Sequence, residues 1–173
     1  MNLPFYTVGH STRSLGEFAE LLTAGEVRLV VDVRLIRKSR TNPQYSEETL
    51  GASLLEFGIA YQPIPMLGGR RAKSRTVPPD VNGMWDNQSF HNYADYALSD
   101  DFHAGLEQLI TLGRERRTAV MCSEAVWWRC HRRIISDYLL ARGETVFHLM
   151  GPARPDPAHL NSGAVVEGSG TVV

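Results

Sequence analysis

The sequence lacks the long apolar runs and the cysteine density that define several classes of protein. No stretch approaches the roughly 20 apolar residues of a membrane-spanning helix, and residues 1–10 have neither the basic region nor the apolar core of a secretory signal. Only two cysteines, Cys122 and Cys130, are present, too few for a disulfide scaffold. We therefore expect a cytoplasmic protein with no membrane partner, in which both cysteines are free thiols.

An excess of charge of one sign is also lacking. The 18 basic and 19 acidic residues give a formal net charge of −1, so no overall field draws the molecule to nucleic acid or anionic lipid. Only Lys38 and Lys73 of the basic residues are lysine. This bias favours bidentate contacts to phosphate or carboxylate, although a codon preference of the genome would explain it equally well. Any anion must therefore be bound by a local cluster of arginines.

Several catalytic and cofactor motifs are missing. The chain has no GxGxxG, Walker A or GxSxG motif. Cys122 also lacks the arginine that cysteine-dependent phosphatases carry six positions later, because Trp128 stands there. Neither a CxxC nor an HxxxH pair supports a zinc site. We expect no cofactor and no bound metal.

What the sequence does have is an alternation of β-prone and helical stretches. Strands are predicted at 5–8, 29–33, 59–64, 118–121 and 145–149, and helices at 14–25, 46–58, 89–97, 100–113 and 127–142. Residues 1–150 then form a single α/β domain, followed by a Pro/Gly-rich C-terminal tail, 151–173, that we expect to be peripheral or mobile. The pattern predicts a three-layer sandwich with a mostly parallel five-stranded sheet in the order 3-2-1-4-5.

The richest concentration of reactive side chains follows the fourth predicted strand. Cys122 and Glu124 come directly after it, and Cys130 and His131 follow a few residues later. Ligands of open α/β sheets bind outside the carboxyl ends of the strands, at the point where the strand order reverses. In the predicted order the first and fourth strands are neighbours, which brings His10 beside Cys122. We therefore place the site at this edge of the sheet.

Three residues form the predicted catalytic set. Cys122 is the candidate nucleophile, because a helix N-terminus and nearby cations lower the pKa of a thiol. Glu124 and His10 are candidate acids or bases. Each has a structural alternative: Cys122 as a small buried apolar residue, Glu124 as the anchor of an arginine, and His10 as a cap of its turn.

Basic residues recur after the second, third and fourth strands, which indicates an anionic substrate. On a helix starting at Trp127, Cys130 and His131 would point about 100° apart, so only one of them would face the turn. Two of the neighbouring arginines on that helix would converge on one anion. The predicted substrate-binding residues are Ser11, Arg13, Arg34, Arg70, Arg129, His131 and Arg132.

With these residues in view, the chain resembles the family catalogued as domain of unknown function 488. The resemblance lies in the segments TVGHSTRSLGEF, LVVDVR, SRTNPQYS, LGGRR, FHNYADY and MCSEAVWWRCHRRIISDYLLARG. It implies an α/β fold but no established activity. It also implies a shared pocket around His10, Arg13, Arg34, Cys122, Glu124, Cys130, His131 and Arg132.

These features predict a small enzyme acting on an anionic, phosphate-bearing substrate that is a nucleotide or is linked to nucleic acid. A hydrolase or transferase with a cysteine nucleophile fits them. One alternative is a non-catalytic module that binds nucleic acid or a nucleotide and stacks Trp128 on a base. A further alternative is a metal or redox protein that uses Cys122 and Cys130. The expected partner is an anionic small molecule or nucleic acid, and the sequence sets no oligomeric state.

Overall fold

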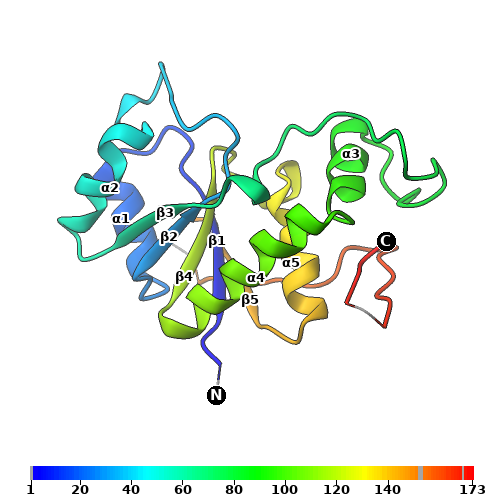
Figure 1. Cartoon of the computed structure of the whole chain (residues 1–173). Coiled ribbons are helices and arrows are strands. Elements are labelled where there is room, and N and C mark those ends of the chain that lie inside the picture. Colours follow the sequence, from blue (N-terminus) through cyan, green and yellow to red (C-terminus); the bar gives the residue numbers. More distant parts are fainter. Residues whose placement is uncertain (1, 152–153, 169) are drawn as a thin grey trace.

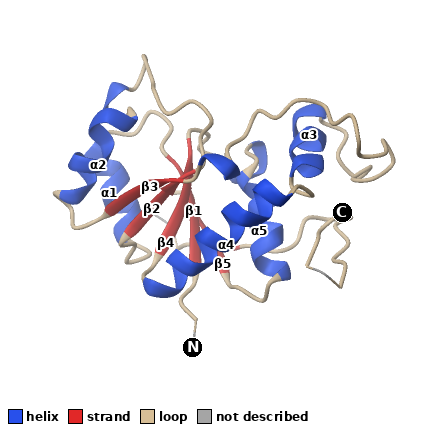
Figure 2. Cartoon of the chain, in the orientation of Figure 1, coloured by secondary structure: helices blue, strands red, loops and turns tan. Residues whose placement is uncertain are grey.

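The fold is a mostly parallel sheet covered by helices on both faces (Figures 1 and 2). A computed structural model describes residues 2–151, 154–168 and 170–173. One core cluster packs α1 (Leu15–Thr23) and α2 (Glu47–Leu55) against one face of the sheet. The other cluster packs α4 (Asp100–Glu115) and α5 (Arg132–Ala141) against the opposite face, with α3 (Gln88–Tyr96) beside them. The predicted three-layer α/β class is confirmed.

The sheet has the order β3-β2-β4-β1-β5-β6. Its strands are β1 (Phe5–Gly9), β2 (Leu29–Asp32), β3 (Ala60–Pro63), β4 (Thr118–Cys122), β5 (Val146–Leu149) and the short β6 (Asp156–Pro157). All pairs are parallel except β5 with β6. The order agrees roughly with the prediction, but β4 lies between β2 and β1 instead of beyond β1. Because β1 and β4 are both wholly buried five-residue strands, their hydrophobicity alone does not predict which of the two lies next to β2.

The pairing of β1 with β4 brings the predicted neighbours together. Gly9 lies opposite Cys122 in the register. The ladder continues past the strand ends, because the His10 N–H donates to the Cys122 carbonyl at 3.0 Å and the Ser11 N–H donates to the Ser123 carbonyl at 3.0 Å. The predicted meeting of the two strand tips is thus confirmed.

One predicted helix begins at the wrong residue. We expected it to start at Trp127, but Trp127–Arg129 form only a short 3₁₀ helix and α5 starts at Arg132. Between them Cys130 is extended, with φ −128° and ψ 148°. Aromatic and β-branched residues before Cys130 favour helix only weakly, and Trp127 stacks on His148 at a ring separation of 4.5 Å instead of continuing a helix.

The described part of the C-terminal tail packs against α5. The Tyr138 hydroxyl donates to the Val172 carbonyl at 3.2 Å, and the Asn161 amide donates to Asp137 at 2.7 Å. Ala158 and Val172 are buried. Residues 152–153 and 169, which belong to the predicted tail, lie outside the described residues.

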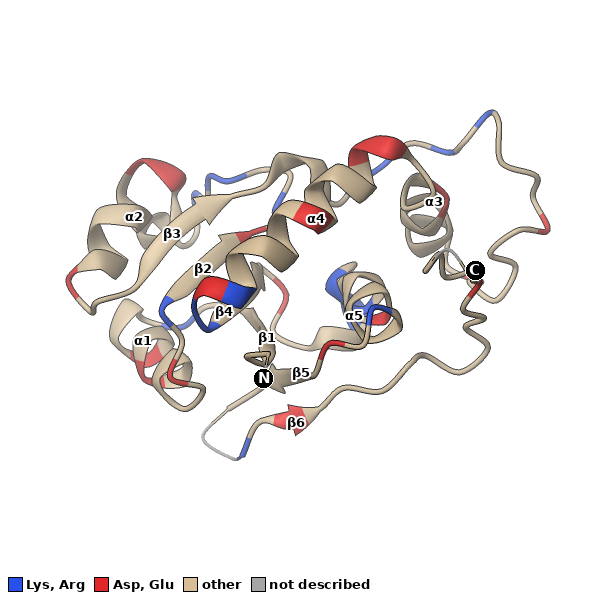
Figure 3. Ribbon diagram, turned by 60° about the horizontal axis from the view of Figure 1, so that its bottom comes forward, with Lys and Arg blue, Asp and Glu red and all other residues tan. Residues whose placement is uncertain are grey.

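Charged residues of both signs are interspersed over the ribbon (Figure 3). Every helix in the described part of the chain is too short or too polar to span a lipid bilayer.

Two helical glycines give a matched test of the packing. A Cβ on Gly113 of α4 would lie 2.2 Å from two ring atoms of the fully buried Phe5, whereas one on Gly16 of α1 would meet nothing within 4 Å. We expect Gly113→Ala to lower the free energy of unfolding by about 1–3 kcal/mol. Gly16→Ala should raise it by about 0.5–1 kcal/mol. Urea denaturation measures both, and equal effects would contradict this packing.

Candidate functional site

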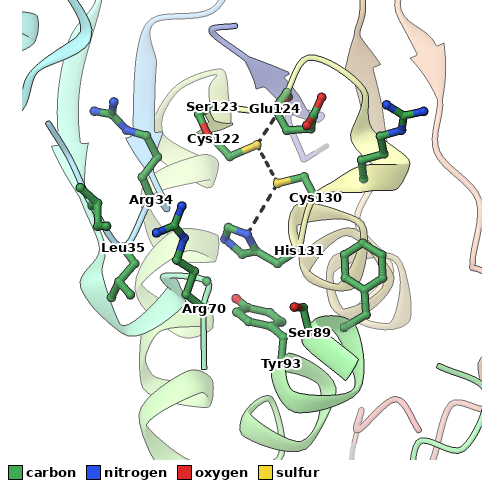
Figure 4. A pocket seen from close by; sticks show the side chains of 14 residues that line it. Arg34, Leu35, Arg70, Ser89, Tyr93, Cys122, Ser123, Glu124, Cys130 and His131 are labelled. Atoms are coloured by element: carbon green, nitrogen blue, oxygen red, sulfur yellow. Dashed lines mark hydrogen bonds between the residues drawn. The ribbon is translucent and has the colours of Figure 1, made fainter. Parts of the chain in front are cut away.

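A pocket of about 300 Å³ opens at the carboxyl edge of the sheet (Figure 4). We call it the thiol pocket, because Cys122 and Cys130 both line it. Charged and polar side chains share its wall with an apolar group contributed by the segment after β2 and by α3. The remaining lining residues are Arg34, Leu35, Ile36, Gly69, Arg70, Ser89, Phe90, Tyr93, Ser123, Glu124, Arg129 and His131.

A second hollow of about 410 Å³, the outer groove, adjoins the thiol pocket. The two share Arg34, Ile36, Arg70, Ser123 and Glu124. The outer groove adds further residues that follow β1, β2 and β4, namely His10, Ser11, Thr12, Lys38, Ser39, Thr41, Asn42 and Ala125. Chain segments from the ends of three neighbouring strands therefore line one continuous depression.

The side chain of Arg132 lies beneath the thiol pocket and is fully buried. Its Nη1 donates to the Cys122 Sγ at 2.9 Å and to the Glu124 carbonyl at 2.8 Å, and its Nη2 donates to the Ala125 carbonyl at 3.1 Å. Its Nε has no hydrogen-bond partner within the described part of the chain. Arg132 therefore holds the turn after β4 against the thiol of Cys122.

No carboxylate within 4.0 Å pairs with Arg132 among the described residues. Burying a guanidinium without a counter-charge destabilises the folded protein by on the order of several kcal/mol. A thiolate at Cys122 supplies that charge. Burial raises the pKa of the Cys122 thiol, but the hydrogen bond from Cys130 and the charge of Arg132 outweigh burial and lower the pKa to about 7.

Cys130 is the second thiol of the pocket. Its Sγ lies 2.6 Å from the Cys122 Sγ, and both cysteines are free and almost fully buried. Burial and the neighbouring Cys122 raise the pKa of Cys130 well above its ordinary value. Cys130 therefore stays protonated and donates its S–H to the Cys122 thiolate.

His131 completes a chain of three groups that is drawn in Figure 4. Because a carbonyl only accepts, the contact of His131 Nε2 with the Val33 carbonyl at 2.9 Å places the ring proton on Nε2. The unprotonated Nδ1 then faces the Cys130 Sγ at 3.6 Å. Burial lowers the pKa of His131 to about 4, so the ring is neutral near pH 7.

The expectation that only one of Cys130 and His131 faces the site is wrong. Both line the thiol pocket. The expectation assumed helical geometry at both residues, whereas Cys130 is extended and His131 is the residue before α5. The extended backbone lets consecutive side chains approach the same hollow.

His10 and Arg34 form a second buried network with Asp32. The Arg34 Nε and Nη2 donate to the two Asp32 carboxylate oxygens at 2.9 and 2.7 Å, and the Tyr61 hydroxyl donates to the same carboxylate. The Arg34 Nη1 lies 3.3 Å from His10 Nε2, and His10 Nδ1 contacts the Ser11 carbonyl at 2.8 Å. Burial lowers the pKa of His10. Both ring nitrogens of this neutral histidine are therefore engaged.

The other predicted site residues fall into two groups. Arg70, Glu124 and Arg129 are exposed and line the thiol pocket. Arg13 instead turns away, donating to the carbonyls of Gly9 and Met150, and Arg132 lies under the pocket floor. The convergence of helical arginines on one anion does not occur, since Arg129 precedes α5 and Arg133 binds Asn161.

Sequence reasoning missed several residues that shape the pocket. Gly9 is one of them, because a Cβ there would lie 1.7 Å from the Glu124 carbonyl and 2.8 Å from the Arg132 Nη1. Ser89, Phe90 and Tyr93 are others, and they come from α3 at a distance that spacing does not reveal. No group of three or more potential metal-ligating side chains is found within residues 2–151, 154–168 and 170–173.

The contact between the two sulfurs gives a testable titration. Thiolate absorbance should rise near pH 7 in the parent protein, and Cys122→Ser should remove this step. Cys130→Ala removes the S–H donor and should raise the pKa of Cys122, whereas Cys130→Ser keeps a donor and should raise it less. Because folding lowers the pKa of Cys122, the associated stability is present above the unfolded value of 9.0 and is lost as pH falls through about 7. A first thiolate appearing only above pH 9 would contradict the assignment.

Comparison with known proteins gives one match. The family model described as Domain of unknown function DUF488 matches residues 14–139. No curated protein and no solved structure matches the chain. The matched range contains every residue that lines the thiol pocket, together with Arg132. The chain belongs to the DUF488 family.

Proposed function

We propose that this protein is an enzyme in which the Cys122 thiolate attacks a small anionic, phosphate-bearing substrate. One observation carries the proposal: the Cys122 Sγ lines a pocket and receives a hydrogen bond from a buried arginine that has no carboxylate partner among the described residues. Such a sulfur is ionised to a large extent near neutral pH, and the thiolate is the nucleophilic form of cysteine.

Two arginines supply positive charge at the pocket rim. Arg70 and Arg129 are exposed, line the pocket and have no ion pair or hydrogen bond of their side chains in the described part of the chain. Arg70 also holds a left-handed backbone, φ 57°, which a non-glycine residue adopts at a cost of about 1 kcal/mol or more. Uncommitted guanidiniums of this kind favour phosphate or carboxylate groups.

The apolar part of the wall suits the remainder of such a substrate. Leu35, Ile36, Phe90 and Tyr93 line the same pocket as the two rim arginines. A nucleotide offers both an anion for the arginines and a flat apolar base for these side chains. After attack, the leaving group departs with its bonding electrons and the substrate remains attached to Cys122, as in hydrolases and transferases with a cysteine nucleophile.

Alkylation of Cys122 by a matched pair of reagents tests this function. Iodoacetate is anionic and iodoacetamide is neutral, and both trap a thiolate. We expect Arg70→Ala and Arg129→Ala each to slow iodoacetate about tenfold, because a hydrogen bond to a charged group contributes about 1.5 kcal/mol or more. The rate with iodoacetamide should change little, and inorganic phosphate should protect Cys122 in the parent protein.

Arg75→Ala is the matched control, since Arg75 is an exposed arginine that does not line the thiol pocket. It should leave both rates unchanged. The proposed anion site is excluded if all three arginine variants keep the parent ratio of the two rates and phosphate gives no protection.

A further inference from the structure

Nucleophilic attack by Cys122 alone does not use two neighbouring side chains of the pocket, Cys130 and His131. Cys130 lies 2.6 Å from the nucleophilic sulfur, and His131 presents its unprotonated Nδ1 to Cys130 at 3.6 Å. A disulfide bond is about 2.0 Å long, so the two sulfurs need to approach by only about half an ångström to bond. Both thiols also line the pocket that would hold the substrate.

We propose that Cys122 and Cys130 act in sequence to reduce a small tetrahedral oxyanion by two electrons, with His131 as the base for Cys130. The inference rests on the nucleophile and the anion pocket of the proposed function, and it names a further substrate class for that site, a reducible oxyanion with the shape and charge of phosphate. Arsenate is the probe of this class, because it has the shape and charge of phosphate but is reduced by thiols.

The first step forms a covalent adduct. The Cys122 thiolate attacks the arsenic(V) centre, a sulfur–arsenic bond forms, and one arsenic–oxygen bond breaks with loss of its oxygen as water after protonation. Cys122 performs this step because its charge is held by Arg132. Cys130 does not compete, because burial and the adjacent Cys122 keep its pKa high and its sulfur protonated.

The second step uses Cys130. Because Cys122 is now bound to arsenic, burial still raises the pKa of Cys130, but the thiolate charge that raised it further is gone. His131 Nδ1 takes the Cys130 proton as the Cys130 sulfur attacks the Cys122 Sγ. The sulfur–sulfur bond forms while the sulfur–arsenic bond breaks, and its electron pair leaves with arsenic, which becomes arsenite. An external dithiol then reduces the disulfide and restores both thiols. Two thiols and one arsenate thus yield one disulfide, one arsenite and one water.

The position of His131 suits its proposed role as the base that deprotonates Cys130. Its Nε2 proton is committed to the Val33 carbonyl, so only Nδ1 can accept a proton from Cys130. The ring also packs against Gly69, where a Cβ would lie 2.7 Å from Nδ1, and it lies beside the Tyr93 ring, with the ring centroids 4.8 Å apart and the planes tilted by 55°. These contacts fix the side of the ring that faces Cys130.

The test incubates reduced full-length protein with arsenate and follows arsenite release and the Cys122–Cys130 disulfide by mass spectrometry. We expect one disulfide per arsenite in the parent protein. Cys130→Ser should retain arsenic on Cys122 and release essentially no arsenite, and Cys122→Ser should form no adduct. His131→Gln should slow disulfide formation about a hundredfold near neutral pH, with recovery at a pH high enough to ionise Cys130 directly.

Inorganic phosphate and hydrogen peroxide separate the possible failures. If phosphate protects Cys122 from iodoacetate but arsenate yields neither an adduct nor a disulfide, the reduction is overturned and the proposed anion site stands. If hydrogen peroxide forms the disulfide in Cys130-containing protein while arsenate does not, the sulfurs are a redox pair and the oxyanion class is overturned. If phosphate gives no protection and arsenate no adduct, both proposals fall.

Discussion

The carboxyl edge of the sheet depends on one contact, between the buried guanidinium of Arg132 and the sulfur of Cys122. The same guanidinium binds two carbonyls of the turn after β4. Removing the Arg132 side chain would leave the Cys122 thiolate without its counter-charge and the two carbonyls without their donor, at a cost on the order of several kcal/mol. The turn, the thiolate and the end of β1 therefore form one unit, in which Gly9 must lack a Cβ.

This contact also determines how the chain enters α5. Arg132 must reach under β4 from the first turn of the helix, which leaves the preceding residues to cross the strand end in a 3₁₀ turn and an extended Cys130. As a result the backbone N–H of Arg132 donates to the Cys130 sulfur at 3.4 Å, and the two sulfurs come within 2.6 Å. The proximity of the thiols follows from the burial of the arginine.

The sequence was sufficient for the α/β class and for the meeting of β1 with β4, because apolar strands alternating with helices permit few other arrangements. It was not sufficient for the position of β4 between β2 and β1 or for the sixth strand, β6. It was insufficient for Arg132, since helical spacing does not distinguish an arginine on the surface from one paired with a thiolate. The tautomer of His131 could not be predicted from the sequence either. It depends on the carbonyl of Val33, which is 98 positions away in sequence, and no local pattern records such a contact.

The arginines around the site divide into two kinds, and the division explains how a chain with a net charge of −1 would select the anion that we propose as its substrate. Arg34 and Arg132 are buried, and each faces a negative or ionisable group, Asp32 for one and Cys122 for the other. These two arginines stabilise the negative charge of their partners, and because each is paired, they contribute little electrostatic field outside the protein. Arg70 and Arg129 are exposed at the pocket rim, and their field acts on whatever enters. Because exposed charges are screened within about 10 Å at ordinary salt, selection of the proposed anion would operate only at the rim, and long-range attraction to nucleic acid would not be needed.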